Sequence, residues 1–318
     1  MRVACPDRKP PAGAPPMRRI SHSAKADPMD AERRKACLQW GLLAAWPTGL
    51  PARAADARRI VSVGGALTEI VFALQANADL VGVDTTSLYP ESAQKLPSVG
   101  YARSLSVEGV LALAPTQVIA TEDAGPPAVL RQLSAAGIPV AVLAANHRFE
   151  GLIERVRHVG ALTGRAARAT ALQQRLQQEW AHARAQVTRR MAGPAARVLF
   201  VLAHAPNQIL VAGTDTSAQA MLEYAASANA IDGFSGYKPL TPEAVIAAQP
   251  DIVLLTDQGL KAAGGVTGIL KLPGLGQTPA GHKRRVIALE AMLMLGFGPR
   301  LPAAVSALHA AIEMAMRA

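Results

Sequence analysis

The 318-residue chain has only two cysteines, Cys5 and Cys37, and both lie near its N-terminus. Residues 55–318 therefore contain none, which excludes disulfides and thiolate metal sites from that part of the chain. The sequence also lacks a G-x-G-x-x-G turn after a strand, a Walker A motif and a G-x-S-x-G nucleophile elbow. A dinucleotide-dependent enzyme or a serine hydrolase consequently has no support, and we expect that the protein is not an enzyme.

Most of the excess positive charge belongs to the first 54 residues. They contain 10 of the 33 basic and 4 of the 23 acidic side chains, so the net charge falls from +10 for the whole chain to +4 for residues 55–318. This small net charge gives little support for a basic surface that binds nucleic acid, and we expect no nucleic-acid partner.

Residues 1–54 have the pattern of a leader. Residues 2–28 are rich in proline, arginine and lysine and show no apolar period. The basic triplet 33–35 then precedes an apolar run, and Ala52-Arg53-Ala54 fits the small-x-small rule for cleavage. This pattern predicts a secretory signal peptide that starts at Met29, is cleaved between 54 and 55 and directs the protein to the periplasm, by Sec or twin-arginine export. The alternative is an unprocessed basic tail.

Short apolar runs alternate with helical segments on both sides of residues 149–192, which predicts an α/β fold with parallel sheets. We expect two Rossmann-like lobes, residues 55–148 and 193–318. Residues 149–192 have a long amphipathic period and no proline, and Gly160 and Gly164 are candidate breaks between a shorter and a longer helix. The predicted architecture is thus two lobes joined by one long α-helix, with small rotation between them. The expected strands are 59–63, 79–83, 117–120, 138–143, 197–202, 208–212, 251–255 and 285–289.

One motif occurs twice. Gly100-Tyr101-Ala102-Arg103 leads through Leu105 and a serine into a helix, and Gly236-Tyr237-Lys238 leads through Leu240 and a threonine into another, with a constant offset of 135 from the two leucines onward. Each copy places a tyrosine and a cation at the start of a helix. The repeat predicts two lobes that face a shared cleft suited to a flat or anionic ligand.

The tyrosine of the first copy is the main candidate for ligand binding. A phenolate oxygen can ligate ferric iron, as in tyrosine-ligated haem proteins. Arg103, two residues after Tyr101, would favour the ionised phenol. His204 follows the first strand of the second lobe, where loops line the ligand crevice of such sheets, and it could reach a metal held by Tyr101. The alternatives are a surface tyrosine, a repeat that reflects architecture alone, and an ordinary loop histidine.

Glu69 and Glu223 form a further pair, because each lies on the first helix after the opening strands of a lobe. Glu69 is expected in the first turn of its helix. Two surface carboxylates, one on each lobe, could dock onto arginine sites of a partner. The alternatives are ordinary acidic residues of a first helical turn for Glu69 and of a solvated face for Glu223.

Over residues 58–315 the chain resembles the periplasmic haemin-binding proteins, the substrate-binding components of bacterial haem ABC importers. The stretches that carry the resemblance are 62–74, 99–109, 211–216, 236–241, 272–275 and 295–300, whereas the methionines of 290–295 depart from it.

This resemblance implies that the transported ligand is haem with ferric iron. Tyr101 would be the axial iron ligand and Arg103 its hydrogen-bonding neighbour, with His204 as a second ligand. Tyr237 and Lys238 would line the pocket or meet a propionate. By the same resemblance, Glu69 and Glu223 would dock the lobes onto the dimeric permease of an ABC transporter at the inner membrane, with an outer-membrane haem receptor as an indirect partner.

Three other functions stay open on the sequence. The first is binding of cobalamin, which would not need Tyr-x-Arg, or of a ferric siderophore, which would call for more cations. The second is a metal-dependent enzyme on a nitrogenase-like two-lobed scaffold, which would need cysteines or clustered histidines. The third is a haem chaperone or sensor without a role in transport.

Overall fold

The computed structural model describes residues 58–190, 194–205 and 208–318. The predicted leader, its cleavage site and both cysteines lie outside the described residues. Residues Asp56–Ala318 form one compact unit. None of the described helices combines the length and the apolar character that a membrane crossing requires.

The first sheet is parallel throughout, as expected. Its strands β1 (Ile60–Val63), β2 (Leu80–Val83), β3 (Gln117–Thr121) and β4 (Val140–Leu143) lie in the order β2-β1-β3-β4. The strand order changes direction between β1 and β3, and loops beyond the carboxyl ends of strands at such a switch point form the usual ligand crevice of parallel sheets. We call this sheet, with the helices α1 to α3, the N-terminal lobe.

The helices of the N-terminal lobe are short. They are α1 (Gly65–Ala73), α2 (Val107–Leu111) and α3 (Pro127–Ala135). Ser106, the serine that the sequence places before this helix, is the N-cap of α2, and its hydroxyl accepts a hydrogen bond from the amide of Gly109 at 2.9 Å. Three short 3-10 helices are present as well, at Asn77–Asp79, Glu91–Lys95 and, later in the chain, Leu275–Gln277.

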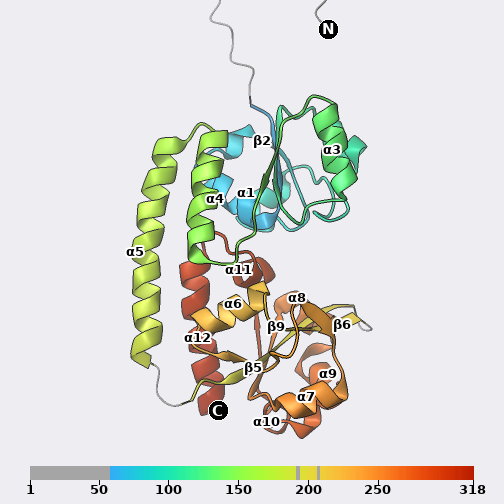
Figure 1. Ribbon diagram of the computed structural model, residues 1–318, viewed down its shortest axis with the longest axis vertical. Coiled ribbons are helices and arrows are strands. Elements are labelled where there is room, and N and C mark those ends of the chain that lie inside the picture. The colour runs from blue at the N-terminus through green and yellow to red at the C-terminus, as the bar shows by residue number, and fades with distance from the viewer. Residues whose placement is uncertain (1–57, 191–193, 206–207) are drawn as a thin grey trace, which may run out of the picture. The chain divides into compact units, whose positions relative to one another are not determined.

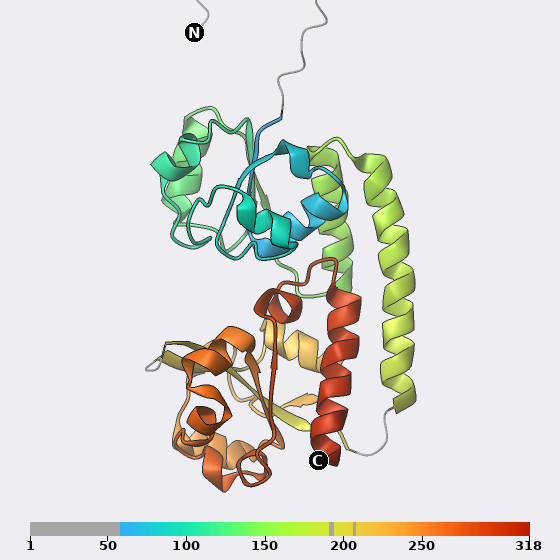
Figure 2. The ribbon, with the colours of Figure 1, turned by 180° about the vertical axis from the view of Figure 1, so that it is seen from behind.

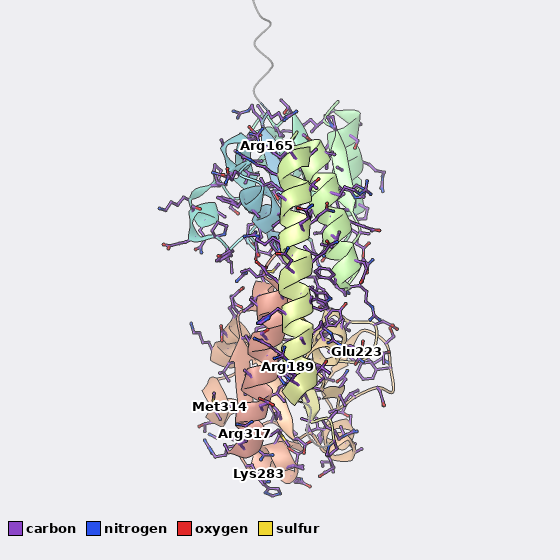
Figure 3. The ribbon with its side chains drawn as sticks, turned by 90° about the vertical axis from the view of Figure 1, so that its left-hand side faces the viewer. Arg165, Arg189, Glu223, Lys283, Met314 and Arg317 are labelled. Carbon is purple, nitrogen blue, oxygen red and sulfur yellow. The ribbon has the colours of Figure 1, made fainter. Side chains whose placement is uncertain are left out.

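The long amphipathic segment forms two helices, α4 (Phe149–Leu162) and α5 (Ala166–Arg190). They are separated at Gly164, whose φ of 68° lies in the left-handed region that favours glycine. The 25 residues of α5 span about 37 Å at 1.5 Å each. Figures 1 and 2 show α5 beside both α4 and α12, and Figure 3 labels Arg165 and Arg189 near its two ends. The sequence therefore identified this helix and its break.

The second sheet is mixed, which differs from the expected parallel arrangement. Its order is β10-β9-β5-β6-β8, and the two-residue strand β7 also pairs with β5. Strand β6 runs antiparallel to both β5 and β8. Because β5 ends at Ala205 and β6 begins at Gln208, the connection is too short for a parallel crossover. The strands are β5 (Arg197–Ala205), β6 (Gln208–Ala212), β7 (Ala228–Asn229), β8 (Tyr237–Pro239), β9 (Ile252–Thr256) and β10 (Val286–Leu289).

We call the mixed sheet, with the helices that follow α5, the C-terminal lobe. Thr216 and Thr241 cap its helices α6 and α7 through their hydroxyl groups. The helices are α6 (Ser217–Tyr224), α7 (Pro242–Ala248), α8 (Asp257–Ala262), α9 (Gly265–Leu270), α10 (Pro279–His282), α11 (Ala291–Leu295) and α12 (Leu301–Arg317).

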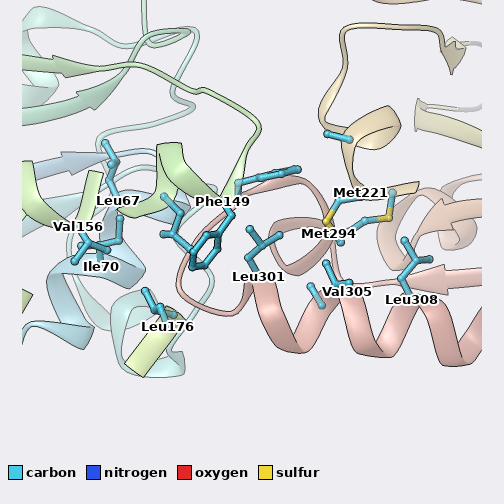
Figure 4. Close-up of a cluster of buried hydrophobic side chains, with 14 of the residues drawn as sticks. Leu67, Ile70, Phe149, Val156, Leu176, Met221, Met294, Leu301, Val305 and Leu308 are labelled. Carbon is cyan, nitrogen blue, oxygen red and sulfur yellow. The ribbon is translucent and has the colours of Figure 1, made fainter. Parts of the chain in front are cut away.

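The largest buried cluster of apolar side chains includes residues from both lobes and from the connecting helices. In Figure 4, Leu67 and Ile70 of α1 belong to the same cluster as Leu176 of α5, Met221 of α6 and Leu301 of α12. Full burial of such a side chain contributes roughly 1.5–3 kcal/mol. The lobes therefore share this cluster, and each lobe also has a smaller buried cluster of its own, around Val118 in the N-terminal lobe and around Val253 in the C-terminal lobe.

Candidate ligand-binding site

The loop that carries Tyr101 is fixed mainly by backbone hydrogen bonds. The amide of Ser104 donates to the Tyr101 carbonyl at 2.8 Å and closes a turn. Gly125, in the loop after β3, donates to the Ala102 carbonyl and accepts from the Leu105 amide, both at 2.8 Å. The Tyr101 loop is thus attached to the carboxyl end of β3 at the switch point of the sheet.

Tyr101, Arg103 and Asp123 form a linear set of polar contacts. Tyr101 is 42% exposed. Nη1 of Arg103 lies 3.4 Å from the Tyr101 hydroxyl oxygen, while Nε and Nη2 donate to Oδ2 of Asp123 at 3.0 and 2.7 Å. The phenol therefore lies beside a cation that is also bound to Asp123.

Arg103 and Asp123 each stabilise the charged form of the other. Burial lowers the pKa of Arg103, but the hydrogen bonds and the charge of Asp123 outweigh that effect and leave the pKa raised. Burial likewise raises the pKa of Asp123, yet hydrogen bonds from Thr121 and Arg103, with the arginine charge, leave it lowered. Both groups are consequently ionised at neutral pH.

The sequence repeat is also a structural repeat. Gly100 and Gly236 have φ values of 91° and 79°, both in the left-handed region that suits glycine. The hydroxyls of Ser106 and Thr241 cap the helices that follow the two loops. The two copies therefore share their turn and their cap.

The two tyrosines nevertheless have different surroundings. Tyr237 lies in the edge strand β8, pairs with Ala212 and is only partly exposed. Burial raises the pKa of Tyr237, and a hydrogen bond with Ser217 and the charge of Arg103 act against that increase. The charge of Arg103, in the first copy of the repeat, therefore acts on Tyr237 in the second copy.

Lys238 is exposed, and its Nζ lies 4.8 Å from the centroid of the Phe234 ring. A lysine at this distance is held over the aromatic face by a cation–π interaction. Its ammonium group remains accessible next to Tyr237. His204 lies within β5 and not in a loop after the strand, so the placement expected from the sequence is wrong because the strand extends to Ala205. Its side chain falls outside the described ones, and its role as a second ligand stays a prediction.

The structure adds two polar residues near the cleft that the sequence reasoning missed. Asp123 follows β3, and His147 follows β4 and packs on the ring of Phe297 with centroids 5.3 Å apart. Burial and the charge of Arg155 lower the pKa of His147. The signal available in the sequence was their position in the loops that follow strands of a parallel sheet, the same rule that pointed to His204.

His147 also lines a cavity of about 300 Å³ between the loop before α4 and the start of α6. This volume is at the lower limit of typical ligand pockets. Thr216, which lies near the Tyr237 hydroxyl, is part of the lining, whereas Tyr101 is not. Among the residues that the structure describes, no three histidine, cysteine, aspartate or glutamate side chains gather as a metal site.

Glu69 is not the surface carboxylate that the sequence suggested. Its side chain is 4% exposed and accepts hydrogen bonds from Nε and Nη2 of Arg300. It is the fifth residue of α1 and lies beyond the first turn. The reason is that the segment 298–300 packs over α1, which covers the carboxylate. The expected exposure is wrong, while a role in docking stays a prediction.

Glu223 does lie at the surface, with 45% of its side chain exposed (Figure 3). Its Oε2 lies 3.7 Å from Nη1 of Arg148, and its Oε1 accepts a hydrogen bond from Gln219 at 2.7 Å. The docking role of Glu223 likewise remains a prediction, but its exposure agrees with the expectation.

Two α/β lobes that share a buried cluster, each with a copy of the tyrosine loop, define a two-lobed ligand-binding protein. The chain belongs to the periplasmic binding protein family, whose model matches residues 60–293. A curated relative, the uncharacterized ABC transporter substrate-binding lipoprotein YvrC of Bacillus subtilis, is 27% identical over 248 residues, which is 77% of each chain.

Two similar solved structures are periplasmic heme-binding proteins. BhuT, in complex with two hemes, is 45% identical, with a TM-score of 0.78 over 81% of this chain and 99% of its own. RhuT from Roseiflexus sp. RS-1, in apo form, is 43% identical, with a TM-score of 0.79 over 82% of this chain and 99% of its own.

Proposed function

We propose that this protein binds ferric haem through the Tyr101 oxygen and delivers it to the permease of an ABC transporter. The observation that carries the proposal is the exposed Tyr101 phenol, with Nη1 of Arg103 3.4 Å from its oxygen. The identity of 45% to a protein crystallised with two hemes supports the same ligand.

The chemistry of the site favours an anionic oxygen ligand. A phenolate is a hard donor suited to ferric iron, and a guanidinium beside it stabilises its charge. Tyr237, which is only partly exposed, would present its ring to the porphyrin. The exposed ammonium of Lys238 would meet a propionate, and His204 would be the second axial ligand.

Delivery requires export and docking. The predicted signal peptide would carry the chain into the periplasm, where residues 55–318 would act as a binding protein and not as an enzyme. Glu223, which is exposed, would engage an arginine of the permease. Glu69 would take part only if docking opened its contact with Arg300.

The test is a haemin titration of the purified protein and of Tyr101→Phe, followed by absorption spectroscopy. The wild type should give a saturable Soret change and a ferric high-spin spectrum typical of tyrosinate ligation. Loss of the phenolate should weaken haem binding by at least about tenfold. This is the lower end of the loss of metal affinity that follows when only a group supporting a metal ligand is mutated. A low-spin wild-type spectrum would add His204 or another strong-field ligand.

Tyr89→Phe is the matched control, because Tyr89 is also exposed, at 48%, and its ring also lies beside an arginine, 4.0 Å from Cζ of Arg300. This variant should bind haem as the wild type does. An unchanged spectrum and affinity in Tyr101→Phe would refute the ligand assignment. Uptake no better than nonspecific binding, with saturable binding of cobalamin or a ferric siderophore, would refute haem as the ligand.

A further inference from the structure

We propose that Asp123 is a positioning residue, which holds the Arg103 guanidinium so that it donates to the Tyr101 ligand oxygen. This inference rests on the proposed capture of haem by Tyr101. Asp123 lies outside the tyrosine repeat. It contacts Arg103, and it would act on the Tyr101 ligand only through that arginine.

The geometry divides the arginine donors between two partners. Nε and Nη2 of Arg103 both donate to Oδ2 of Asp123, at 3.0 and 2.7 Å, and Nη1 is left for the Tyr101 oxygen at 3.4 Å. Because a guanidinium is planar, two bonds on one edge fix the direction of the remaining donors. Without Asp123, the half-exposed arginine side chain would sample several rotamers.

Asp123 is itself attached to the end of a strand. A hydrogen bond from Thr121, the last residue of β3, helps to lower the pKa of the aspartate. The amide of Ala124 donates to the Thr121 carbonyl at 3.0 Å, and Gly125 binds the Tyr101 loop through its amide and its carbonyl. The sheet therefore sets the position of the carboxylate, and the carboxylate sets that of the arginine.

Asp123 has two effects on an iron-bound phenolate, and they differ in sign. Its negative charge opposes the negative phenolate, so removal of the charge alone would strengthen ligation. Its hydrogen bonds keep a cationic donor on the phenolate, so removal of the positioning would weaken ligation. The sign of the change in a variant therefore distinguishes the two roles.

The experiment follows the tyrosinate charge-transfer band of the haem-loaded full-length protein as the pH is lowered. In Asp123→Ala, the band should be lost at a pH higher than in the wild type by about half a unit to one unit, the size expected of a partly exposed charged hydrogen bond. Arg103→Ala should give a similar shift. The double variant should show no further shift, because both changes remove the same contact.

Two further variants separate positioning from charge and from folding. Asp123→Asn keeps an acceptor oxygen of similar shape without the charge, so it should restore the wild-type transition or move it to lower pH. Glu122→Ala removes the same charge from the neighbouring exposed carboxylate and should not raise the transition. Thermal unfolding of each variant confirms that the shift arises in a folded protein.

The outcomes keep the two proposals apart. A wild type without haem, or with haem but without a tyrosinate band, overturns the proposed function and this inference together. A normal wild-type band with an unchanged or lowered transition in Asp123→Ala overturns the positioning role alone. If Asp123→Asn raises the transition as far as Asp123→Ala does, geometry is not the cause, and the inference is again overturned.

Discussion

Glu69 and Arg300 form a buried ion pair, and we expect substitution of the arginine to destabilise the protein more than substitution of the glutamate. Arg300 has a second carboxylate partner, since its Nη2 lies 2.9 Å from Oε2 of Glu290. Glu69 depends on Arg300, and its side chain is 4% exposed. Arg300→Met should therefore leave an unpaired buried carboxylate, whereas Glu69→Gln should leave an arginine that is still paired.

The expected magnitudes follow from this asymmetry. Removal of one partner of a buried pair usually costs about 3–5 kcal/mol. The Arg300 side chain is 22% exposed, so water can partly replace it, and we expect Arg300→Met to lower the free energy of unfolding by about 2–3 kcal/mol at neutral pH. Glu69→Gln keeps an acceptor for Arg300 and should cost less than about 1 kcal/mol.

The loss should also depend on pH. Burial raises the pKa of Glu69 above its ordinary value of 4.5, and Arg300 opposes that increase. Without the arginine, the folded-state pKa should rise further. A carboxyl group whose pKa is higher in the folded than in the unfolded protein contributes fully to the free energy of unfolding below its unfolded-state pKa. This contribution is lost as the pH rises through the folded-state pKa. The effect of Arg300→Met should thus be small near pH 4.5 and complete at neutral pH.

Chemical denaturation of both variants and of the double variant, at pH 4.5 and 7.5, measures these differences. The double variant should be more stable at pH 7.5 than Arg300→Met alone, because it no longer contains an unpaired carboxylate. Equal losses in the two single variants, or a loss in Arg300→Met that does not change with pH, would refute the reasoning.

Three other substitutions test parts of the fold and of the cleft. Gly164→Ala should lower the free energy of unfolding by about 1–2 kcal/mol in chemical denaturation, because φ is 68° and a methyl group would lie 2.4 Å from Nη1 of Arg58. Gly233→Ala, where a methyl group meets no atom within 4 Å, is the control and should change little. Leu176→Ala, at a fully buried position of α5, should cost about 2–5 kcal/mol by the same measurement, and a smaller loss would contradict the shared core. Lys238→Ala should weaken haem binding in a titration while changing the free energy of unfolding by less than about 0.5 kcal/mol, and an unchanged affinity would remove Lys238 from the site.

The parts of the structure that the sequence predicted depend on local patterns. The cap at Ser106 is set by a hydroxyl group one residue before a helix, and the buried face of α5 is set by the spacing of residues such as Leu172 and Leu176. The repeat identified the Tyr101 loop for the same reason. Signals of this kind extend over one or two helical turns, so they can be read without the tertiary structure.

The parts that the sequence did not predict depend on distant partners. The burial of Glu69 results from Arg300, 231 residues further along the chain, and no local pattern indicates that contact. Asp123 was missed because its role depends on Arg103, which lies 20 residues earlier in a different loop. The mixed second sheet is a different case, because the short connection between β5 and β6 is a local signal for an antiparallel pair that the sequence analysis did not use, and only the pairing of the three-residue strand β8 with β6 depends on the fold.

The shared core predicts that haem binds to a largely preformed cleft. Arg155 of α4 donates to the carbonyls of Ala144 and Asn146 in the N-terminal lobe and, at 2.8 Å, to the carbonyl of Phe297 in the segment before α12. Burial of Arg155 lowers the pKa of its guanidinium to about 10. The side chain therefore stays charged at neutral pH, and its hydrogen bonds persist.

A large rotation of the lobes would break these bonds and expose side chains such as Phe149 and Leu301, at roughly 1.5–3 kcal/mol each. A ligand that acts on two states of a protein typically supplies about 1–3 kcal/mol of coupling. The free-energy cost of exposing several buried side chains is therefore larger than the coupling free energy that the ligand supplies. Small-angle X-ray scattering should give nearly the same radius of gyration with and without haemin. A clear decrease on binding would show that the lobes close and that the core between them is not rigid.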